Sequence, residues 1–287
     1  MSTWTAEDPP VLAPPPTIGK VVGSLRVASV VAITLVAVGL FLLGRGMRAV
    51  LGRWVTFHFG VAWVWSRICL WLFGVRLVVH GRPVTSGALV ANHSSWLDIL
   101  ALRSVKLLYF VSKAEVADWP GVGFITRITG TVFIERRRSQ AKEQERVLRE
   151  RIAADQRLCF FPEGTSTDGL RVLPFKSSLF SAFFEDGAGA DIAIQPVTVR
   201  YSVPDGPLEL PRNFYGWWGD MGFEAHIWDV VTRSFGGKVD VIFHPPVSAA
   251  EFEDRKRLAE HCFRTVAAGM AVDGAEAQKP EKELTDG

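Results

Sequence analysis

A histidine and an aspartate in the segment Asn92–Asp98 have the types and the spacing for proton-transfer chemistry. The apolar run Ala88–Ala91 enters this segment like the end of a strand, and Ile99–Leu102 continues it like a buried helix. Active sites of open α/β folds lie at such strand-to-helix corners. His93 could therefore remove a proton from a substrate, and Asp98 could hold the imidazole in the required tautomer.

A structural role is the alternative for the same residues. Ser95 and Asp98 fit the pattern S-x-x-D of a capping box at the start of the following helix. On a regular helix with about 3.6 residues per turn, positions five apart point roughly 140° away from each other. His93 and Asp98 can therefore meet only if His93 lies in the loop and Asp98 turns back from the first helical turn. These residues alone leave both roles open.

An arginine at the end of a predicted strand is a second candidate. Residues 130–136 read Gly-Thr-Val-Phe-Ile-Glu-Arg, and the guanidinium of Arg136 could clamp an anionic head group with its planar fork. Because Arg137 and Arg138 follow directly, a basic strand end beside a membrane is the alternative.

Two further segments are candidates. One carries a carboxylate directly after a predicted strand, and the other carries a proline within a predicted strand. Residues 161–165 read Phe-Pro-Glu-Gly-Thr, where Glu163 could accept a hydrogen bond from a substrate hydroxyl and Gly164 permits close approach of the backbone. A plain loop is the alternative. Pro196 is disfavoured inside a central strand, so residues 194–199 are predicted to form an edge or bulged strand.

The composition favours a membrane surface and argues against several classes of protein. Hydrophobic residues make up 48% of the 287 residues, with ten Trp and 19 Phe against three Tyr. A net charge of +2 is too small to indicate nucleic acid as a partner. Three distant cysteines and the lack of an H-E-x-x-H pair indicate no metal site. The lack of a G-x-S-x-G elbow argues against a serine hydrolase.

The N-terminal part is predicted to anchor the chain in a membrane. Residues 1–19 are polar and rich in proline, which predicts disorder. The uncharged run Val27–Gly44 would extend roughly 27 Å as a helix, close to the hydrocarbon thickness of about 30 Å. A buried core helix is the alternative for this run.

A second apolar segment favours the membrane interface. Trp54–Phe73 mixes many aromatic side chains with a histidine and an arginine, which suits a helix lying in the interface. Arginines at 45, 48 and 53 separate the two segments, and they would face the outside if both segments crossed. We therefore expect an anchor over residues 20–73, as one span or as a helix pair in one leaflet, with the chain after Arg45 in the cytoplasm.

From residue 75 onward, short apolar runs alternate with helical patterns, which predicts an α/β domain over residues 74–271 with a largely parallel or mixed sheet flanked by helices. Residues 272–287 are predicted to be a disordered tail. The predicted strands are Val75–Val79, Ala88–Ala91, Leu107–Val111, Thr131–Ile134, Leu158–Phe161, Ile192–Arg200 and Val239–Phe243. The predicted helices include Trp96–Arg103, Val122–Thr129, Ser139–Ala154, Ser177–Phe184 and Ala249–Met270.

Taken in order, the four segments resemble the motifs of the glycerolipid acyltransferase family. His93 and Asp98 match its H-x4-D motif, Gly130 and Arg136 match its block containing G-x5-R, and residues 161–165 match F-P-E-G-T. The resemblance covers roughly residues 75–245. It implies a single acyltransferase domain behind an N-terminal membrane anchor.

The resemblance also implies roles for individual residues. His93 would be the general base on the free hydroxyl of a lysolipid, oriented by Asp98, with direct attack on the thioester of acyl-ACP or acyl-CoA. The head group would be held by Arg136 and by the turn Glu163–Thr165, which includes Gly164. Lys113 would help to neutralise the oxyanion, and Lys176 resembles a lysine common after F-P-E-G-T. A membrane-bound scaffold without chemistry is the non-enzymatic alternative.

One departure from the family pattern bears on the acceptor. Phosphate-handling relatives commonly continue F-P-E-G-T with arginine, whereas Ser166, Thr167 and Asp168 follow here. With residues 215–221, Tyr-Gly-Trp-Trp-Gly-Asp-Met, the pattern is similar to the bacterial branch that acylates lyso-ornithine lipid. That enzyme would make ornithine lipid at the bacterial inner membrane from the cytoplasmic side, without cofactor, metal or nucleic acid. The alternative is acylation of lysophosphatidic acid to phosphatidic acid, or both activities.

Overall fold

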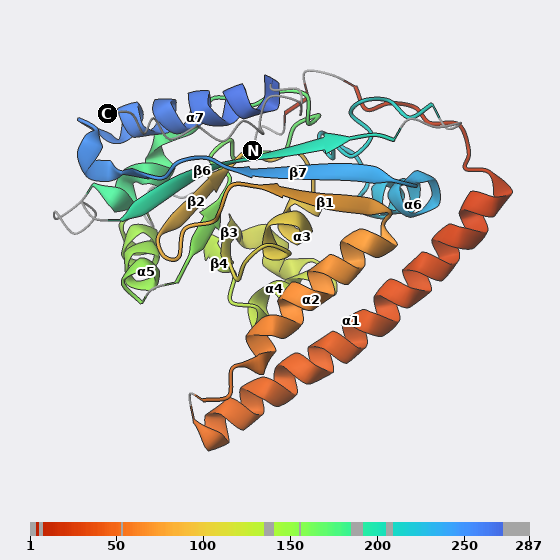
Figure 1. The fold of residues 1–287 in the computed structure, drawn as a ribbon, viewed down its shortest axis with the longest axis horizontal. Helices are drawn as coiled ribbons and strands as arrows, with labels where there is room; N and C mark the ends of the chain where they lie inside the picture. Colours follow the sequence, from red (N-terminus) through yellow and green to blue (C-terminus); the bar gives the residue numbers. More distant parts are fainter. Residues whose placement is uncertain are drawn as a thin grey trace, which may run out of the picture.

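The computed structural model describes residues 4–5, 8–52, 54–134, 141–154, 156–184, 192–204 and 209–271. Its centre is a mixed sheet with the strand order β1-β7-β6-β2-β5-β3-β4, and β8 pairs with β6 (Figure 1). The strands are β1 (Val75–His80), β2 (Ala88–Ala91), β3 (Tyr109–Lys113), β4 (Val132–Ile134), β5 (Leu158–Phe160), β6 (Ala193–Ser202), β7 (Gly237–Phe243) and β8 (Val247–Ser248). The predicted fold class is confirmed.

Five neighbouring strands run in the same direction. The pairs β6–β2, β2–β5, β5–β3 and β3–β4 are parallel, and β6–β7 is antiparallel. The carboxyl ends of parallel strands meet at one edge of a sheet, which is where ligands bind in open α/β folds. The segments that follow β2 and β5 therefore lie side by side at this edge.

Side chains of the central strands alternate between two cores, because successive residues of a strand point to opposite faces. On β2, Leu89 and Ala91 pack into the core that faces α2 and α3, whereas Ala88 and Val90 pack into the other core. Figure 1 shows α7 covering the second face and α2 and α3 the first. A sheet covered on both faces explains why these strands are continuous apolar runs without polar alternation.

The helices largely follow the predicted ranges. They are α1 (Thr17–Leu51), α2 (Phe57–Leu72), α3 (Leu97–Arg103), α4 (Val122–Ile128), α5 (Ala141–Ala153), α6 (Phe223–Arg233) and α7 (Arg255–Ala271), with 3-10 turns η1 (Ala114–Asp118), η3 (Ser177–Phe183) and η4 (Ala249–Glu251).

Two of the predicted helices differ in type or extent. Residues 177–183 form a 3-10 helix, with the amide of Leu179 bonded to the carbonyl of Lys176. The range predicted from Ala249 to Met270 is broken: a capping box of Ser248 and Glu251 begins the short turn η4, which ends at Phe252 in an extended conformation, and Asp254 then caps α7.

Helix α6 is absent from the predicted helices. Its apolar residues Phe223, Ile227, Val230 and Val231 follow the helical spacing, and the last two are fully buried. The helical spacing was therefore present in the sequence, directly after the aromatic residues of the segment 215–221.

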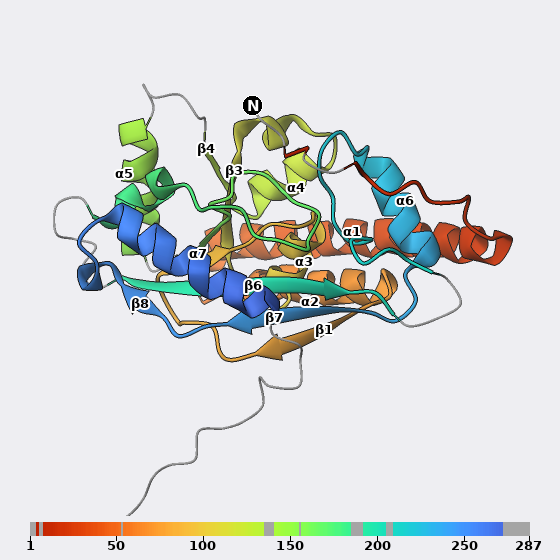
Figure 2. The ribbon, with the colours of Figure 1, turned by 90° about the horizontal axis from the view of Figure 1, so that it is seen from above.

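Helices α1 and α2 form an antiparallel hairpin along one side of the sheet (Figures 1 and 2). Trp65 of α2 donates from its indole to Thr34 Oγ1 of α1 at 2.9 Å. A Cβ on Gly44 would approach His58 Cβ to 2.6 Å, so the glycine permits this close packing. By length and composition α1 could cross a membrane: an 18-residue window has a mean hydropathy of 2.6 and is only 6% buried.

Both ends of the apolar run in α1 are attached to the domain that carries the sheet. Arg26 donates to the carbonyls of Val231 and Ser234 at the end of α6, at 2.9 and 2.8 Å. At the other end, Arg45 donates to the carbonyl of Ile128 at the end of α4, at 3.3 Å. Both ends of the apolar run in α1 are therefore bound to the domain that carries the sheet.

Parts of the segment predicted to be disordered have defined contacts. Leu12 packs against the core that faces α2 and α3, and the carbonyl of Ala13 accepts a hydrogen bond from Arg233. The indole of Trp4 lies 6.2 Å from that of Trp218, and residues 17–19 begin α1. Composition predicted disorder because the segment has little apolar surface of its own, but its few apolar side chains find partners on the domain.

Candidate active site

The strand ends bring the predicted site residues together. His93 follows β2, Glu163 follows the neighbouring β5, Lys113 ends β3, and Tyr201 lies near the end of β6. Because these strands are parallel neighbours, residues from distant parts of the chain meet at one edge of the sheet. Arg136, the other predicted head-group residue, lies outside the residues that the structure describes.

His93 and Asp98 are in direct contact. The imidazole Nδ1 lies 2.8 Å from Asp98 Oδ2, and the side chains are 22% and 0% exposed. The contact has the predicted form, with His93 in the loop and Asp98 in the first turn of α3. A carboxylate on Nδ1 keeps the proton on that nitrogen, so Nε2 is free to act as a base.

Asp98 also organises the loop around it. Its Oδ2 accepts the amides of Ser94 and Ser95 at 2.8 and 3.0 Å, and its Oδ1 accepts the hydroxyl of Tyr201 at 2.8 Å. The bond from the Ser95 amide is one half of the capping box anticipated for this position. The structural role and the pairing with His93 therefore coexist in one carboxylate.

The backbone of His93 is held from behind by the Phe-Pro-Glu-Gly-Thr turn. The amide of His93 donates to Glu163 Oε1 at 2.7 Å, and the amide of Leu173 donates to Oε2 at 2.7 Å. The carbonyl of His93 accepts the amide of Thr167 at 3.0 Å. The ring of His93 stacks on Phe161, with centroids 4.3 Å apart. Glu163 is 2% exposed, so the structure places it as a support of the histidine loop.

The environment of Glu163 shifts its protonation. Burial raises the pKa of the Glu163 carboxyl to about 8, and the amides of Leu173 and His93, which favour the ionised form, offset only part of this effect. Between the usual pKa of 4.5 and about 8, the unfolded chain has released this proton while the folded protein still holds it. Stability therefore falls as the pH rises through this window.

Substituting Glu163 by Gln is expected to weaken that pH dependence, because the amide carries no titrating proton. Thermal unfolding at pH 5 and pH 8 measures it: the decrease in Tm between the two should be smaller in Glu163→Gln than in the wild type. An equal decrease in both proteins would show that other groups set the pH dependence.

The remaining predicted binding residues belong to the Phe-Pro-Glu-Gly-Thr turn, to the end of β3 and to the residue before η3. Gly164 has a φ of 72°, a left-handed conformation that glycine adopts without strain. Thr165 Oγ1 accepts the amide of Trp4 at 3.4 Å and donates to the carbonyl of Ser166 at 3.3 Å. Lys113 is half-buried at the end of β3. The amide of Lys176 bonds to the carbonyl of Pro162 at 3.0 Å.

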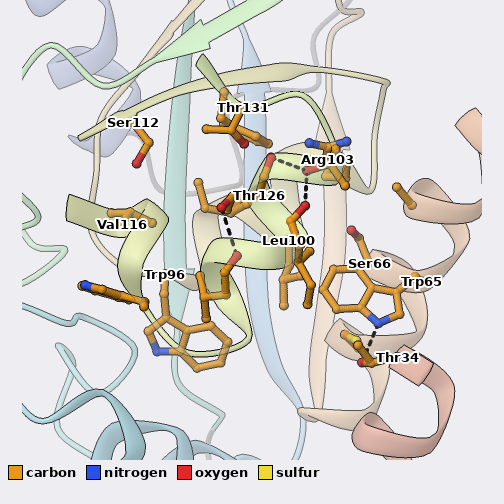
Figure 3. A pocket seen from close by; sticks show the side chains of 18 of the residues that line it. Thr34, Trp65, Ser66, Trp96, Leu100, Arg103, Ser112, Val116, Thr126 and Thr131 are labelled. Carbon is orange, nitrogen blue, oxygen red and sulfur yellow. Dashed lines mark hydrogen bonds between the residues drawn. The ribbon is translucent and has the colours of Figure 1, made fainter. Parts of the chain in front are cut away.

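An apolar cavity of about 440 Å³ opens beside His93. It lies between the α1–α2 hairpin and the domain, and is lined by α3, the end of β3 and α4 as well (Figure 3). Aromatic side chains near His93 form part of its wall, among them Trp96, Trp119 and Trp217. A long apolar chain is the kind of ligand that matches this lining.

Comparison with known proteins identifies the group to which the chain belongs. A family model described as Acyltransferase matches residues 76–200. A lyso-ornithine lipid O-acyltransferase of Rhodobacter capsulatus is 45% identical over 269 residues, which cover 93% of this chain and 96% of that protein. The chain belongs to the acyltransferase family. The resemblance predicted from the motifs is confirmed.

Other members of the acyltransferase family differ in the acceptor that they are named for. A lyso-ornithine lipid O-acyltransferase of Brucella abortus is 37% identical, covering 67% of this chain and 75% of that protein. A 1-acyl-sn-glycerol-3-phosphate acyltransferase of Neisseria gonorrhoeae is 34% identical, covering 67% and 74%. The crystal structure of an acyltransferase for lysophosphatidic acid from Thermotoga maritima has the same fold, with a TM-score of 0.60, 22% identity, and coverage of 88% and 96%.

Two contacts of this acyltransferase site were not predicted: the hydrogen bond from Tyr201 to Asp98, and the ion pair between Asp168 and Arg171. Tyr201 contacts Asp98 across 103 positions of sequence, and nothing local marks it. Asp168, the anion that departs from the family pattern, is fully buried and paired with Arg171 Nη2 at 2.8 Å. Its charge is therefore compensated within the turn, and Arg171 also lies over the ring of Trp4, at 5.2 Å.

Tyr201→Phe is expected to lower kcat for acyl transfer by about tenfold or more, because one hydrogen bond to a charged group contributes roughly 1.5–3 kcal/mol. The matched control is Tyr215→Phe, whose hydroxyl bonds to Ser234 Oγ at 2.8 Å while its ring lies 5.6 Å from that of Tyr201. Steady-state kinetics and thermal unfolding of both variants measure the effect. If both lowered kcat equally, the Tyr201 hydroxyl would have no special role at Asp98.

Proposed function

We propose that this protein transfers a fatty acyl group from a thioester to the free hydroxyl of a lysolipid, with lyso-ornithine lipid as the acceptor. The observation that carries the proposal is the His93–Asp98 pair at the wall of an apolar cavity, with Nδ1 bonded to the carboxylate. This arrangement offers a base for a hydroxyl and an apolar site for an acyl chain in one place.

The proposed reaction uses His93 as general base. Nε2 accepts the proton of the lysolipid hydroxyl while Asp98 stabilises the imidazolium that forms. The hydroxyl oxygen attacks the thioester carbonyl and forms the new C–O bond. The C–S bond then breaks, and the departing sulfur takes the proton back from the imidazolium. No acyl-enzyme is formed, and acyl-ACP or acyl-CoA is the only co-substrate.

The proposed head-group site lies at the strand ends around His93. Lys113 at the end of β3 is assigned to the developing oxyanion, and Gly164, Thr165 and Arg136 to the acceptor's head group. Glu163 holds the backbone amide of His93, so its contribution is to fix the base.

Relatives support lyso-ornithine lipid over lysophosphatidic acid. The relative that covers nearly all of this chain is named for the first acceptor, and those named for the second match a smaller part at lower identity. Lysophosphatidic acid stays the second candidate because a relative at 34% identity carries that name.

The acceptor is tested by offering purified full-length protein both lysolipids, each with acyl-ACP and with acyl-CoA. We expect transfer to lyso-ornithine lipid with kcat/KM at least about tenfold above that for lysophosphatidic acid. Transfer to lysophosphatidic acid alone would overturn the acceptor, and transfer to neither would overturn the reaction. The two thioesters decide the donor in the same assay.

We propose that α1 and α2 dip into the cytoplasmic leaflet of the bacterial inner membrane without crossing it. Arg26 and Arg45 flank the apolar run and bind carbonyls of the same domain. They are nineteen positions apart on α1, which corresponds to about 28 Å along the helix. A crossing helix would carry the end of α4 to the far side of the bilayer together with Arg45. The hairpin therefore fits better as a helix pair in one leaflet.

A thiol at the tip of the hairpin tests this topology. Trp54 is 84% exposed beside the tip, and the three native cysteines are buried. In Trp54→Cys, an impermeant maleimide should label inverted membrane vesicles and leave closed spheroplasts unlabelled. His261→Cys on α7 reports the side of the catalytic domain. Labelling of the two positions from opposite sides would show that α1 crosses.

A further inference from the structure

A buried arginine lines the apolar cavity away from the His93–Asp98 pair. Arg103 is the last residue of α3 and is 6% exposed. Figure 3 shows it in the cavity wall together with Ser66 of α2. Among the described residues that line the cavity there is no other lysine or arginine, and there is no aspartate or glutamate. The cavity thus carries one fixed cation and no anion to balance it.

The contacts of Arg103 leave its donors available to a ligand. Its guanidinium lies over the ring of Phe110, 5.4 Å from the centroid. A cation–π contact covers a face of the guanidinium, whereas the N–H groups point outward in its plane. In the described part of the chain, no carboxylate or carbonyl accepts these N–H groups. Ser66 Oγ in the same wall is fully buried and also has no hydrogen-bond partner there.

Arg103 keeps its charge under ordinary conditions. Burial lowers the pKa of the guanidinium to about 10, which leaves it protonated at neutral pH. An uncompensated charge buried in apolar surroundings costs several kcal/mol, and a well-placed anion with matching hydrogen bonds offsets this cost. A neutral hydroxyl would satisfy the donors but leave the charge unbalanced. The cavity therefore favours an oxyanion over a neutral polar group.

The position of Arg103 separates it from the reaction. The imidazole of His93 stacks on Phe161 at 4.3 Å, Phe161 stacks on Phe110 at 6.3 Å, and Arg103 follows on Phe110. Base and guanidinium are thus at opposite ends of this row of aromatic rings. A group bound at Arg103 is removed from the reacting atoms by two rings.

We propose that Arg103 and Ser66 bind the carboxylate of a free long-chain fatty acid, whose tail fills the apolar part of the same cavity. The planar fork of the guanidinium fits a carboxylate with two parallel hydrogen bonds, and the serine hydroxyl can donate a third. The tail is apolar, and so are the side chains of the hairpin, α3 and α4 that line this part of the cavity. A fatty acid bound in this way would exclude an acyl chain from the cavity. The inference concerns binding and holds whether or not the proposed acyl transfer is correct.

The test compares hexadecanoate with hexadecan-1-ol, which has the same tail without the charge, on full-length protein in nanodiscs. Titration calorimetry should give a Kd for hexadecanoate at least about tenfold lower than for the alcohol, the difference expected for one charge-assisted hydrogen bond. Hexadecanoate labelled with ¹³C at the carboxyl gives a second readout, because a carboxylate beside Arg103 should stay ionised to lower pH than in the nanodisc lipid alone.

Arg103→Met should raise the Kd of hexadecanoate about tenfold and leave the Kd of the alcohol unchanged. Arg127→Met is the matched control, because Arg127 lies on α4 with its side chain 60% exposed and is not part of the cavity wall. Equal affinity of the wild type for the two ligands would overturn the proposal. So would unchanged hexadecanoate binding in Arg103→Met. If Arg103→Met does not fold, the comparison of ligands on the wild type decides alone.

Discussion

His93→Ala is expected to lower kcat for acyl transfer by about 10²–10⁴-fold, the range that a positioned general base contributes. The substitution should leave the fold intact, since the ring is partly exposed and the hydrogen bonds that anchor the loop come from the backbone of His93. KM for the acyl donor should change little, because the apolar cavity is retained. Kinetics with purified protein measure the loss, and thermal unfolding measures the fold.

The control for His93→Ala is His261→Ala, which removes an exposed imidazole on α7. That variant should transfer acyl groups at the wild-type rate. A fully active His93→Ala protein would refute the assignment of the base. A variant that loses activity together with its thermal transition would leave the assignment to be decided by Asp98.

Two substitutions of Asp98 are expected to separate its charge from its structural role. In Asp98→Asn, the amide oxygen can accept from Nδ1 and the two serine amides, and the amide nitrogen can donate to the Tyr201 hydroxyl. The loop should therefore persist, while the imidazolium loses its counter-charge. We expect kcat to fall by about 10²-fold or more, with a loss of stability below about 2 kcal/mol.

Asp98→Ala removes every one of these bonds. Buried amides of Ser94 and Ser95 would then have no acceptor, at roughly 1–3 kcal/mol for each unsatisfied group. We expect a loss of about 3–5 kcal/mol in the free energy of unfolding, measured by urea denaturation. If Asn and Ala destabilised the protein equally, the geometric account of the Asp98 network would fail. An active Asp98→Asn enzyme would limit Asp98 to a structural role.

The parts of the site that lie in one stretch of sequence were predictable. His93 and Asp98 are five residues apart, and a strand-to-helix corner is the geometry in which they can meet. The positions of most strands were predictable too, because a sheet covered on both faces requires continuous apolar runs such as Ala88–Ala91. The edge position predicted for residues 194–199 was wrong, because β6 lies between β7 and β2. Pro196 falls where the antiparallel pairing of β6 passes from β8 to β7. The Phe-Pro-Glu-Gly-Thr turn was located correctly, although the sequence did not reveal that Glu163 faces the amide of His93.

Contacts between distant segments were beyond the reach of the sequence. The bond from Tyr201 to Asp98 depends on which strand lies beside β2, and one sequence does not give the strand order. The environment of Arg103 was not predictable either, because it depends on how α2 and β3 pack around the end of α3. The charge argument on Asp168 was incomplete, because its partner Arg171 lies three residues further on in a turn of unpredicted shape.

The attachment of α1 to α6 has a consequence for the order of events during protein synthesis. Arg26 binds carbonyls that lie 205 and 208 positions later in the chain. The ribosome therefore releases an apolar helix of 35 residues long before its partners exist. Until α6 emerges, only the lipid bilayer or a chaperone can shield that surface from aggregation. On the proposed topology the bilayer is the first folding partner of this protein, and the domain that carries the sheet assembles on a helix that is already bound to lipid.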